Sequence, residues 1–568
     1  MRFRFVFCVV LLIPLLGSAQ QTSNDNDPVM HSLKQELNRS YSVLKKEKVP
    51  PYFISYELTD TRTIQVDSSF GALTASTDKK ARLLDMDLRV GDYKLDNTHD
   101  SGPWNFAAAR FGQVQGQLPI EDGPDALRVA LWLETDRQYK NAVQRFEAVK
   151  TSREMKVADE DKSPDFSPAP PQTYFEDFAP MTFDRAAWEN KARQYGRAFR
   201  RYPDIEGADV TASAETTTRR YINTDGAEIR TSTTLYKLSI SASIKADDGE
   251  NLPLMRIFMS FTPEGLPSDP VVLRTVSEMV DMLLALKKAP VADAYTGPAI
   301  LSSRASAVFF HEIFGHRIEG TRLKEEDDAQ TFKKKVNQQV LPTFLSVYSD
   351  PTVRHFGDSD LVGSYSYDDE GVKARRVAVV EKGTFKTFLM SRSPIKDFSE
   401  SNGHGRRQEG YPIASRQSNL IVEASKTVSR AELKNMLIEL IKKAKTPYGL
   451  FFDDIKGGFT YTSRAVPNSF SVMPTVVYRV YPDGREELVR GLDLIGTPLI
   501  AFSKIVAADN GTGVFNGVCG AESGWVPVSA VAPGLLLEQI EVQRKEKSQQ
   551  PKPILPDPTT AKALKEKP

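Results

Sequence analysis

This 568-residue sequence has little cysteine, no excess of positive or negative charge, and few long apolar runs. Its two cysteines, Cys8 and Cys519, cannot form a disulfide scaffold, which excludes the small disulfide-stapled folds. The 74 Lys and Arg residues balance 74 Asp and Glu residues, so we expect no nucleic acid partner. After residue 19 no apolar run is long enough to span a bilayer, so we also expect no stable membrane anchor.

The first residues have the pattern of a secretory signal peptide. Arg2 and Arg4 precede an apolar run over residues 5–16, and the small residues 17–19 follow it. We expect cleavage after residue 19 and export to the periplasm or the extracellular space. Cleavage would remove two positive charges and Cys8, leaving a net charge of −2 and Cys519 as a single thiol. An unpaired thiol is unusual in an exported protein, so Cys519 is a candidate for a chemical role.

Hydrophobic periodicity divides the remaining chain into two domains of an α+β fold. In residues 20–290, patterns typical of helices and of antiparallel strands alternate, with a Pro-rich insertion near 159–180. Helices are expected over 30–46, 124–156, 184–201 and 270–287, and strands over 52–58, 63–73, 81–95, 209–222, 227–244 and 254–261. Residues 291–544 are predicted to form a β-rich domain with one short helix. Residues 545–568 lack a core pattern, so we expect a disordered tail.

The strongest chemical signal is a glutamate between two histidines: His311, Glu312 and His316. In zinc hydrolases, imidazoles hold the metal and a glutamate is the general base for water. The five-residue spacing is unusual, because such side chains point about 140° apart on a regular α-helix, against about 40° for a four-residue spacing. To bind one ion, the helix must widen into a π-bulge or break near Gly315. Alternatively, both are ordinary helix histidines.

Cys519 is the candidate for a third zinc ligand, since catalytic zinc usually has three protein ligands. Glycines at positions 517 and 520 flank it closely, and a flexible turn would let the thiolate approach a metal. Ligation would keep the thiol deprotonated. The alternative is a small buried thiol without a chemical role.

Several motifs occur together in one order along the chain. They are residues 295–301 (YTGPAIL), 311–320 on the pattern HExxxHxxEG, 367–372 (YDDEGV), 401–407 (SNGHGRR), 519–520 (CG), 527–528 (PV) and 532–534 (APG). In this combination the sequence resembles the TldD/PmbA family of metalloproteases, also called modulators of DNA gyrase, over most of its length. One departure is at 519–524, where the family's usual Cys-Gly-Lys-x-Gly-Gln is Cys-Gly-Ala-Glu-Ser-Gly. Familiar members are cytosolic, whereas this sequence begins with an export signal.

The resemblance implies a function and a set of site residues. It implies a Zn²⁺ ion on His311, His316 and Cys519, with Glu312 as the base that activates the zinc-bound water. It implies hydrolysis of peptides or unfolded polypeptide segments, and assembly as a homodimer or as a heterodimer with a family homologue. Because the partner-type members lack the zinc motif, the four residues indicate the catalytic, TldD-type member.

Four further residues have open roles. Glu319 is either a partner that orients a ligand histidine or a charge at a helix end. His404, Arg406 and Arg407 either bind carboxylate or carbonyl groups of the substrate or belong to a solvated basic loop.

A different class of function stays open beside the peptidase. The chain could be an exported, non-catalytic zinc- or peptide-binding subunit of a TldD/PmbA-like dimer. A structural zinc site needs ligands but no base, so the intact Glu312 favours the peptidase.

Overall fold

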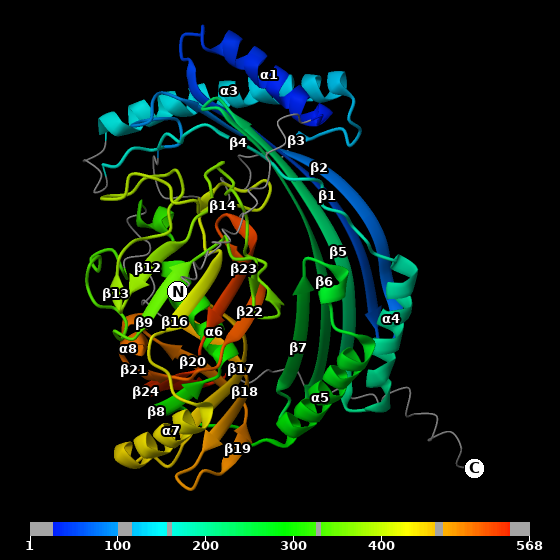
Figure 1. The fold of residues 1–568 in the computed structure, drawn as a ribbon, viewed down its shortest axis with the longest axis vertical. Coiled ribbons are helices and arrows are strands. Elements are labelled where there is room, and N and C mark those ends of the chain that lie inside the picture. The colour runs from blue at the N-terminus through cyan, green and yellow to red at the C-terminus, as the bar shows by residue number, and fades with distance from the viewer. Residues whose placement is uncertain (1–25, 100–115, 156–161, 325–330, 461–469, 546–568) are drawn as a thin grey trace, which may run out of the picture.

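The computed structural model describes residues 26–99, 116–155, 162–324, 331–460 and 470–545. The predicted signal peptide, all but the first residue of the predicted tail and part of the insertion near 97–180 lie outside these ranges. Figure 1 shows a large curved sheet that arches along one side of a β-rich part. Over the described ranges, no helix combines the length and the apolar character that a membrane crossing requires.

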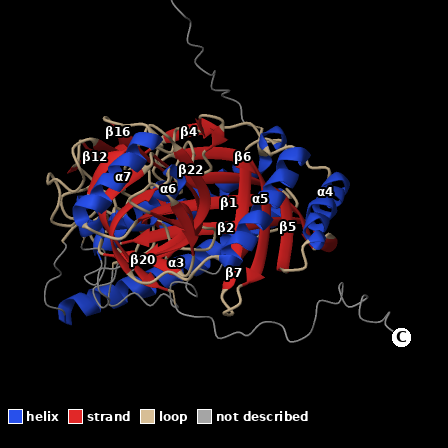
Figure 2. Cartoon of the chain, turned by 90° about the horizontal axis from the view of Figure 1, so that it is seen from below, coloured by secondary structure: helices blue, strands red, loops and turns tan. Residues whose placement is uncertain are grey.

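The N-terminal part consists of one mixed sheet with helices at its two ends (Figures 1 and 2). The sheet order is β3-β2-β1-β5-β6-β4, and β7 also pairs with β6. The strands are β1 (Pro51–Ser69), β2 (Ala72–Val90), β3 (Gly116–Gln117), β4 (Gln172–Phe175), β5 (Ile205–Asn223), β6 (Ala227–Lys245) and β7 (Asn251–Ser260). The helices are α1 (Pro28–Leu44), α3 (Pro124–Met155), α4 (Arg185–Ala198), η1 (Phe199–Arg201), η2 (Pro263–Gly265) and α5 (Asp269–Lys288).

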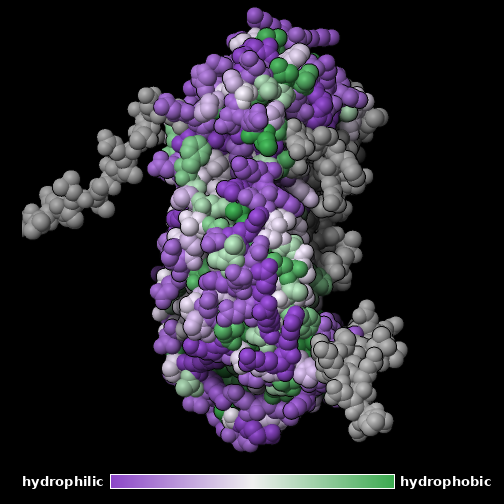
Figure 3. All heavy atoms as spheres, turned by 90° about the vertical axis from the view of Figure 1, so that its right-hand side faces the viewer, coloured by the Kyte–Doolittle hydropathy of each residue, from purple (hydrophilic) through white to green (hydrophobic). Residues whose placement is uncertain are grey.

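Two separate cores hold these helices on the sheet. Helices α1 and α3 pack on β1 and β2, whereas α4 and α5 pack at the other end of the sheet. The hairpin between β5 and β6 turns at Gly226, whose φ of +95° suits glycine. Figure 3 shows the side of the molecule on the right of Figure 1, where hydrophilic residues predominate and apolar ones are scattered.

The C-terminal part contains two larger sheets with a helix between them. One sheet has the order β13-β12-β9-β16-β23-β22, and the other has the order β17-β8-β24-β20-β18-β19, with β21 added on β24. The strands are β8 (Tyr295–Leu301), β9 (Leu345–Ser349), β10 (His355–Phe356), β11 (Ser359–Asp360), β12 (Val377–Glu381), β13 (Thr384–Phe385), β14 (Gly405–Arg406), β15 (Ala414–Ser415), β16 (Asn419–Ala424), β17 (Gly449–Thr460), β18 (Phe470–Val480), β19 (Glu486–Val489), β20 (Leu492–Gly496), β21 (Ile505–Ala508), β22 (Gly513–Ala521), β23 (Gly524–Ala532) and β24 (Leu535–Arg544). The helices are α6 (Ser303–Ile313), η3 (Gly315–Arg317), η4 (Gly320–Lys324), α7 (Arg430–Ala444) and α8 (Pro498–Ser503).

The α+β fold class is confirmed, and two local predictions are wrong. The strand predicted over 52–58 and most of the one predicted over 63–73 are one strand, β1, because its polar middle is paired; the second prediction also ran through the turn at Phe70 and Gly71 into β2. There the Asp60 carboxylate accepts hydrogen bonds from Arg82 and Arg220, each at 2.6 Å. The C-terminal part has more than one short helix, since α7 is 15 residues long.

Candidate metal centre

Helix α6 brings the first two motif residues into the core of the C-terminal part. The Ser302 hydroxyl accepts a hydrogen bond from the Ala305 N–H at 3.1 Å and starts the helix. Every residue from Ala305 to Ile313 is buried, and the helix contacts β17 on one side and β22 and β23 on the other. His311 and Glu312 are therefore held on a rigid, packed element.

The helix breaks before the second histidine. It ends at Ile313, and residues 315–317 form a separate 3-10 turn. A Cβ atom on Gly315 would overlap the side-chain amide of Gln417, so a larger residue would displace that amide from the His311 carbonyl to which it donates. Of the two geometries predicted for the five-residue spacing, the structure shows the break and not a π-bulge. The break turns His316 toward His311, and the two ring centroids are 5.4 Å apart.

Cys519 reaches the same point from strand β22. The thiol sulfur lies 3.2 Å from Nε2 of His316. One potential ligand atom from each of His311, His316 and Cys519 lies within 4.8 Å of the others, and all three side chains are buried. The structure thus brings together residues that are more than 200 positions apart in the sequence.

The three side chains suit a divalent metal such as zinc. Zinc bonds of about 2.0–2.3 Å in a tetrahedron place ligand atoms about 3.3–3.8 Å apart, close to the spacing here. Nδ1 of His311 is buried and has no hydrogen-bond partner in the part of the chain that the structure describes. Two imidazoles and a thiolate are ligands that zinc prefers, and three ligands leave a fourth position for catalysis.

The charges around the thiol favour its deprotonated form. Burial raises the pKa of Cys519, but His316, His311 and Arg416 together hold it well below its usual value. Burial lowers the pKa of His316, but the Cys519 thiolate and the Glu319 carboxylate raise it to about 10. These mutual shifts favour a thiolate beside an imidazolium when no metal is bound, and a metal ion would take the place of the proton.

Glu319 lies directly behind the cluster. Its carboxylate is fully buried and contacts His316 Nδ1 at 3.1 Å, Arg322 at 3.1 Å and Arg416 at 3.2 Å. Burial raises the pKa of Glu319, but His316 and the two arginines hold it far below its usual range. These contacts favour the orienting role for Glu319 over a charge at a helix end, because a partner on Nδ1 leaves Nε2 free to face the thiolate and a metal.

Replacing Glu319 by Gln should weaken zinc binding by about 10–100-fold, as is usual for partners of ligand histidines. It should also cost stability, because Arg416 would lose its carboxylate while buried, a loss of about 3–5 kcal/mol. Competition against a chromophoric chelator and a thermal melt of the metal-free protein measure the two effects separately. A variant with lowered melting temperature but wild-type zinc affinity would show that Glu319 is a structural charge alone.

Glu312 follows His311 on the helix and faces strand β17. Its Oε1 accepts a hydrogen bond from the Gly458 N–H at 3.0 Å. Within the described ranges its Oε2 has no hydrogen-bond partner, and the side chain keeps slight contact with solvent at 8% exposure. The carboxylate is thus fixed by one oxygen and has the other available for a proton.

The structure places His404, Arg406 and Arg407 away from any open surface. His404 is fully buried; its Nε2 contacts the Ser349 hydroxyl at 2.9 Å, and burial lowers its pKa to about 3. Arg406 donates to the Gln417 carbonyl at 2.6 Å, and Arg407 pairs with Glu57 at 3.5 Å. The solvated-loop alternative is wrong. The protein partners of these side chains favour a structural role, and the substrate-binding assignment stays a prediction.

Two residues beside the cluster were not predicted from the sequence. Arg416 is fully buried and donates to the Cys519 carbonyl at 2.8 Å as well as to Glu319. Gln417 donates to the His311 carbonyl at 3.2 Å. Both belong to a segment between β15 and β16 without an active-site motif, so only the fold shows that they are neighbours of the cluster.

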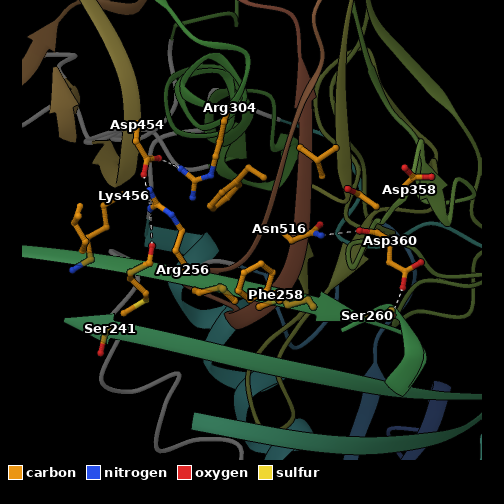
Figure 4. Close-up of a pocket in the computed structure, with 18 of the residues that line it drawn as sticks. Ser241, Arg256, Phe258, Ser260, Arg304, Asp358, Asp360, Asp454, Lys456 and Asn516 are labelled. Atoms are coloured by element: carbon orange, nitrogen blue, oxygen red, sulfur yellow. Dashed lines mark hydrogen bonds and ion pairs between the residues drawn. The ribbon is translucent and has the colours of Figure 1, made fainter. Parts of the chain in front are cut away.

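A pocket of about 440 Å³, shown in Figure 4, lies near the cluster, and Phe515 stands between the two, since none of the four site residues lines the pocket. It lies between β7 of the N-terminal sheet and β22, the strand that carries Cys519. Phe515 lines the pocket and packs on the His311 ring at 5.9 Å between centroids. Lys456 lines it too, two residues before the glycine that holds Glu312. A bound molecule in this pocket would therefore lie near the candidate metal centre.

Comparison with known proteins places this site in a family. Residues 294–544, which include the whole cluster, match the family model of the PmbA/TldA metallopeptidase C-terminal domain. The match assigns the C-terminal part of the chain, which carries the site, to the PmbA/TldD family. Helix α6, the break at Gly315 and strand β22 are all parts of this family domain.

Curated proteins that are similar to about half of this chain carry metalloprotease names. A "Metalloprotease" of Archaeoglobus fulgidus is 26% identical over 265 residues, which are 46% of this chain and 56% of the relative. A "Zinc metalloprotease TldD homolog" of Saccharolobus solfataricus is 25% identical over 249 residues, 43% of this chain and 51% of the relative. The chain spans about half the length of the curated relatives it matches.

Solved structures share the fold over nearly the whole chain. A modulator of DNA gyrase from Thermotoga maritima has a TM-score of 0.59 at 17% identity, and the match covers 90% of this chain and 99% of that one. TldE from Thermococcus kodakarensis has a TM-score of 0.57 at 13% identity, covering 90% of this chain and all of that one. At these identities the likeness concerns the fold alone.

Proposed function

We propose that this protein is a zinc-dependent metallopeptidase that hydrolyses peptides or unfolded polypeptide segments. The observation that carries the proposal is the convergence of His311, His316 and Cys519 beside the Glu312 carboxylate. The metalloprotease names of the relatives support the same reaction class. A structural metal site would need the three ligands but not the glutamate.

The residues of the site have separate tasks in the proposed reaction. A zinc ion on His311, His316 and Cys519 would supply Lewis acidity, polarising a substrate carbonyl and lowering the pKa of water. Glu319 holds the His316 ring in place through Nδ1 at 3.1 Å. Burial of the cluster keeps competing solvent away from its charges, which strengthens their interactions.

Glu312 is the proposed general base. The Gly458 N–H fixes Oε1 at 3.0 Å, so Oε2 accepts the proton of the attacking water. The same oxygen then delivers that proton to the nitrogen of the leaving amine when the C–N bond breaks. One carboxylate thus serves both proton transfers, and the strand β17 sets its orientation.

Metal-dependent cleavage of an unstructured protein tests the proposal. The purified full-length chain should cleave casein, lose this activity when 1,10-phenanthroline removes the metal, and regain it with one equivalent of Zn²⁺. Gel electrophoresis of the digest and metal analysis of the same samples measure both quantities. Cleavage that survives complete metal removal would contradict the proposal, as would a zinc-loaded protein that leaves casein intact.

Two broader assignments accompany the peptidase proposal. The charged and apolar N-terminal pattern of residues 2–16 supports export to the periplasm or the extracellular space. The match of the C-terminal part to the PmbA/TldD family supports assembly with a second copy or with a family homologue. Static light scattering of the purified protein, alone and mixed with a homologue from the same source, distinguishes the two assemblies.

A further inference from the structure

The pocket near the candidate metal centre has two ends of opposite charge. Figure 4 shows Arg256, Arg304, Asp454 and Lys456 gathered at one end, and Asp358, Asp360 and Ser260 at the other. Apolar side chains of β7 and β22, including Phe258 and Phe515, lie on the pocket wall as well. A ligand in this pocket therefore meets a different charge at each end.

The basic end has more positive than negative charge. The Asp454 carboxylate accepts from Arg256 at 2.8 Å and also pairs with Arg304. One carboxylate cannot neutralise two guanidinium groups, so this ion-paired group keeps one positive charge. Lys456 is exposed, and no residue of the described ranges forms an ion pair or hydrogen bond with its side chain. It adds a second positive charge at this end of the pocket.

At the acidic end, Asp360 is held by protein partners, whereas Asp358 is exposed. The Asp360 carboxylate accepts from the Ser260 hydroxyl at 2.7 Å and from the Phe261 N–H at 2.8 Å. It also contacts Nδ1 of the exposed His355 at 2.6 Å. Among the exposed charged side chains of the pocket, Lys456 is the one on β17, the strand that also holds Glu312.

Lys456 lies close in the chain to the residue that positions Glu312. Lys456 precedes Gly458 by two residues on β17, and the Gly458 N–H holds Glu312. The pairing of β17 with β18 shifts register between Ile455 and Gly457, so Lys456 lies at a β-bulge and the strand there is shorter than the roughly 7 Å that two regular residues span. An extended peptide that passes the site would therefore bring a side chain about one to two residues from its scissile bond opposite Lys456.

We propose that Lys456 selects the substrate by binding a carboxylate about one to two residues from the scissile bond. The proposal rests on the proposed peptidase function and names its substrate class: segments with Asp or Glu at that position, or with a free C-terminal carboxylate there. Arg256 and Arg304 do not take this role, because both already share Asp454. Their guanidinium groups instead hold β7, β17 and α6 together at the basic end of the pocket.

The test uses octapeptides of uncharged residues in which one Glu is moved through every position, each with a Gln counterpart. Both ends are blocked in one set, and the C-terminal carboxylate is free in a second set, which separates the two sources of the carboxylate. Wild type should cleave the best Glu peptide about five- to tenfold faster in kcat/KM than its Gln counterpart, as expected for one partly exposed ion pair. The preference should shrink as salt is raised.

Variants of Lys456 decide the assignment. Lys456→Met should abolish the preference for Glu over Gln, and Lys456→Glu should turn it into a preference for Lys at the same position. Lys443→Met removes an exposed lysine on α7 and should leave the preference unchanged. Equal rates for Glu and Gln peptides at every position would overturn the proposal, as would a preference that survives in Lys456→Met.

Binding separates this proposal from the proposed function. Isothermal titration calorimetry of the same peptides with zinc-loaded Glu312→Gln protein needs no cleavage. A five- to tenfold tighter binding of the Glu peptide, without cleavage of any peptide by wild type, would reject the peptidase and keep the Lys456 assignment. Cleavage by wild type without any preference in rate or binding would reject Lys456 and keep the peptidase.

Discussion

Glu312→Gln is expected to abolish casein cleavage while the protein keeps its zinc. A glutamine has nearly the same shape and can still accept the Gly458 hydrogen bond, but it cannot take a proton from water at neutral pH. General bases contribute about 10²–10⁴-fold to a rate, so the loss should be of that size. Initial rates on a quenched fluorescent peptide and zinc content per chain measure the two properties on one preparation.

Glu381→Gln is the matched control for this variant. Glu381 is exposed on β12, so its substitution should leave both the rate and the zinc content at wild-type values. Full activity of Glu312→Gln would remove the general base from the mechanism. Loss of zinc together with loss of activity would show instead that Glu312 supports metal binding, and the role assigned to it would then be wrong.

Cys519→Ser should have the second large effect, on metal affinity. The buried thiolate is the anionic member of the cluster, and a neutral hydroxyl is a poor zinc ligand. We expect affinity to fall by more than about 100-fold, beyond the 10–100-fold that loss of a ligand's partner costs. Competition titration with a chromophoric chelator measures this change directly.

The neighbouring Val518 provides the control on the same strand. Its side chain is 47% exposed, whereas Cys519 is 6% exposed, so Val518→Ser introduces the same hydroxyl on the outer face of β22. That variant should bind zinc as wild type does. If zinc were retained after Cys519→Ser combined with either His311→Ala or His316→Ala, the three-ligand site would be wrong.

The sequence predicted much of this site because its chemistry is concentrated in short motifs. The spacing of His311 and His316 required a π-bulge or a break near Gly315 if both residues bind one ion. The structure shows the predicted break, with Gly315 packed against Gln417. Cys519 was a candidate because a thiol without a partner needed a reason. Its proximity to His316 depends on the β22–β23 hairpin beside α6, which no local pattern reveals.

Other features of the site could not be predicted from local sequence patterns, because long-range packing determines them. Buried Arg416 and Gln417 owe their places to long-range packing against Glu319 and α6, and a solitary arginine or glutamine in a sequence is typical of a surface. The basic segment with His404 looked solvated, yet its charges are paired inside the protein.

Helix α7 had a local signal that could have been used. Ser429 caps the helix by accepting from the Glu432 N–H at 3.2 Å, and Leu433, Leu437 and Ile441 recur at a four-residue spacing. The long strands are different, because Asp60 in the middle of β1 is polar and only its pairing with Arg82 and Arg220 makes a continuous strand possible.

The most direct test of the central claim is anomalous X-ray diffraction from crystals of the full-length protein at wavelengths on both sides of the zinc absorption edge. The account predicts one strong peak per chain in the difference between the two data sets, within about 2.0–2.3 Å of an imidazole nitrogen of His311, one of His316 and the sulfur of Cys519. A zinc-loaded crystal without a peak at these three residues, or with its peak elsewhere in the chain, would contradict it.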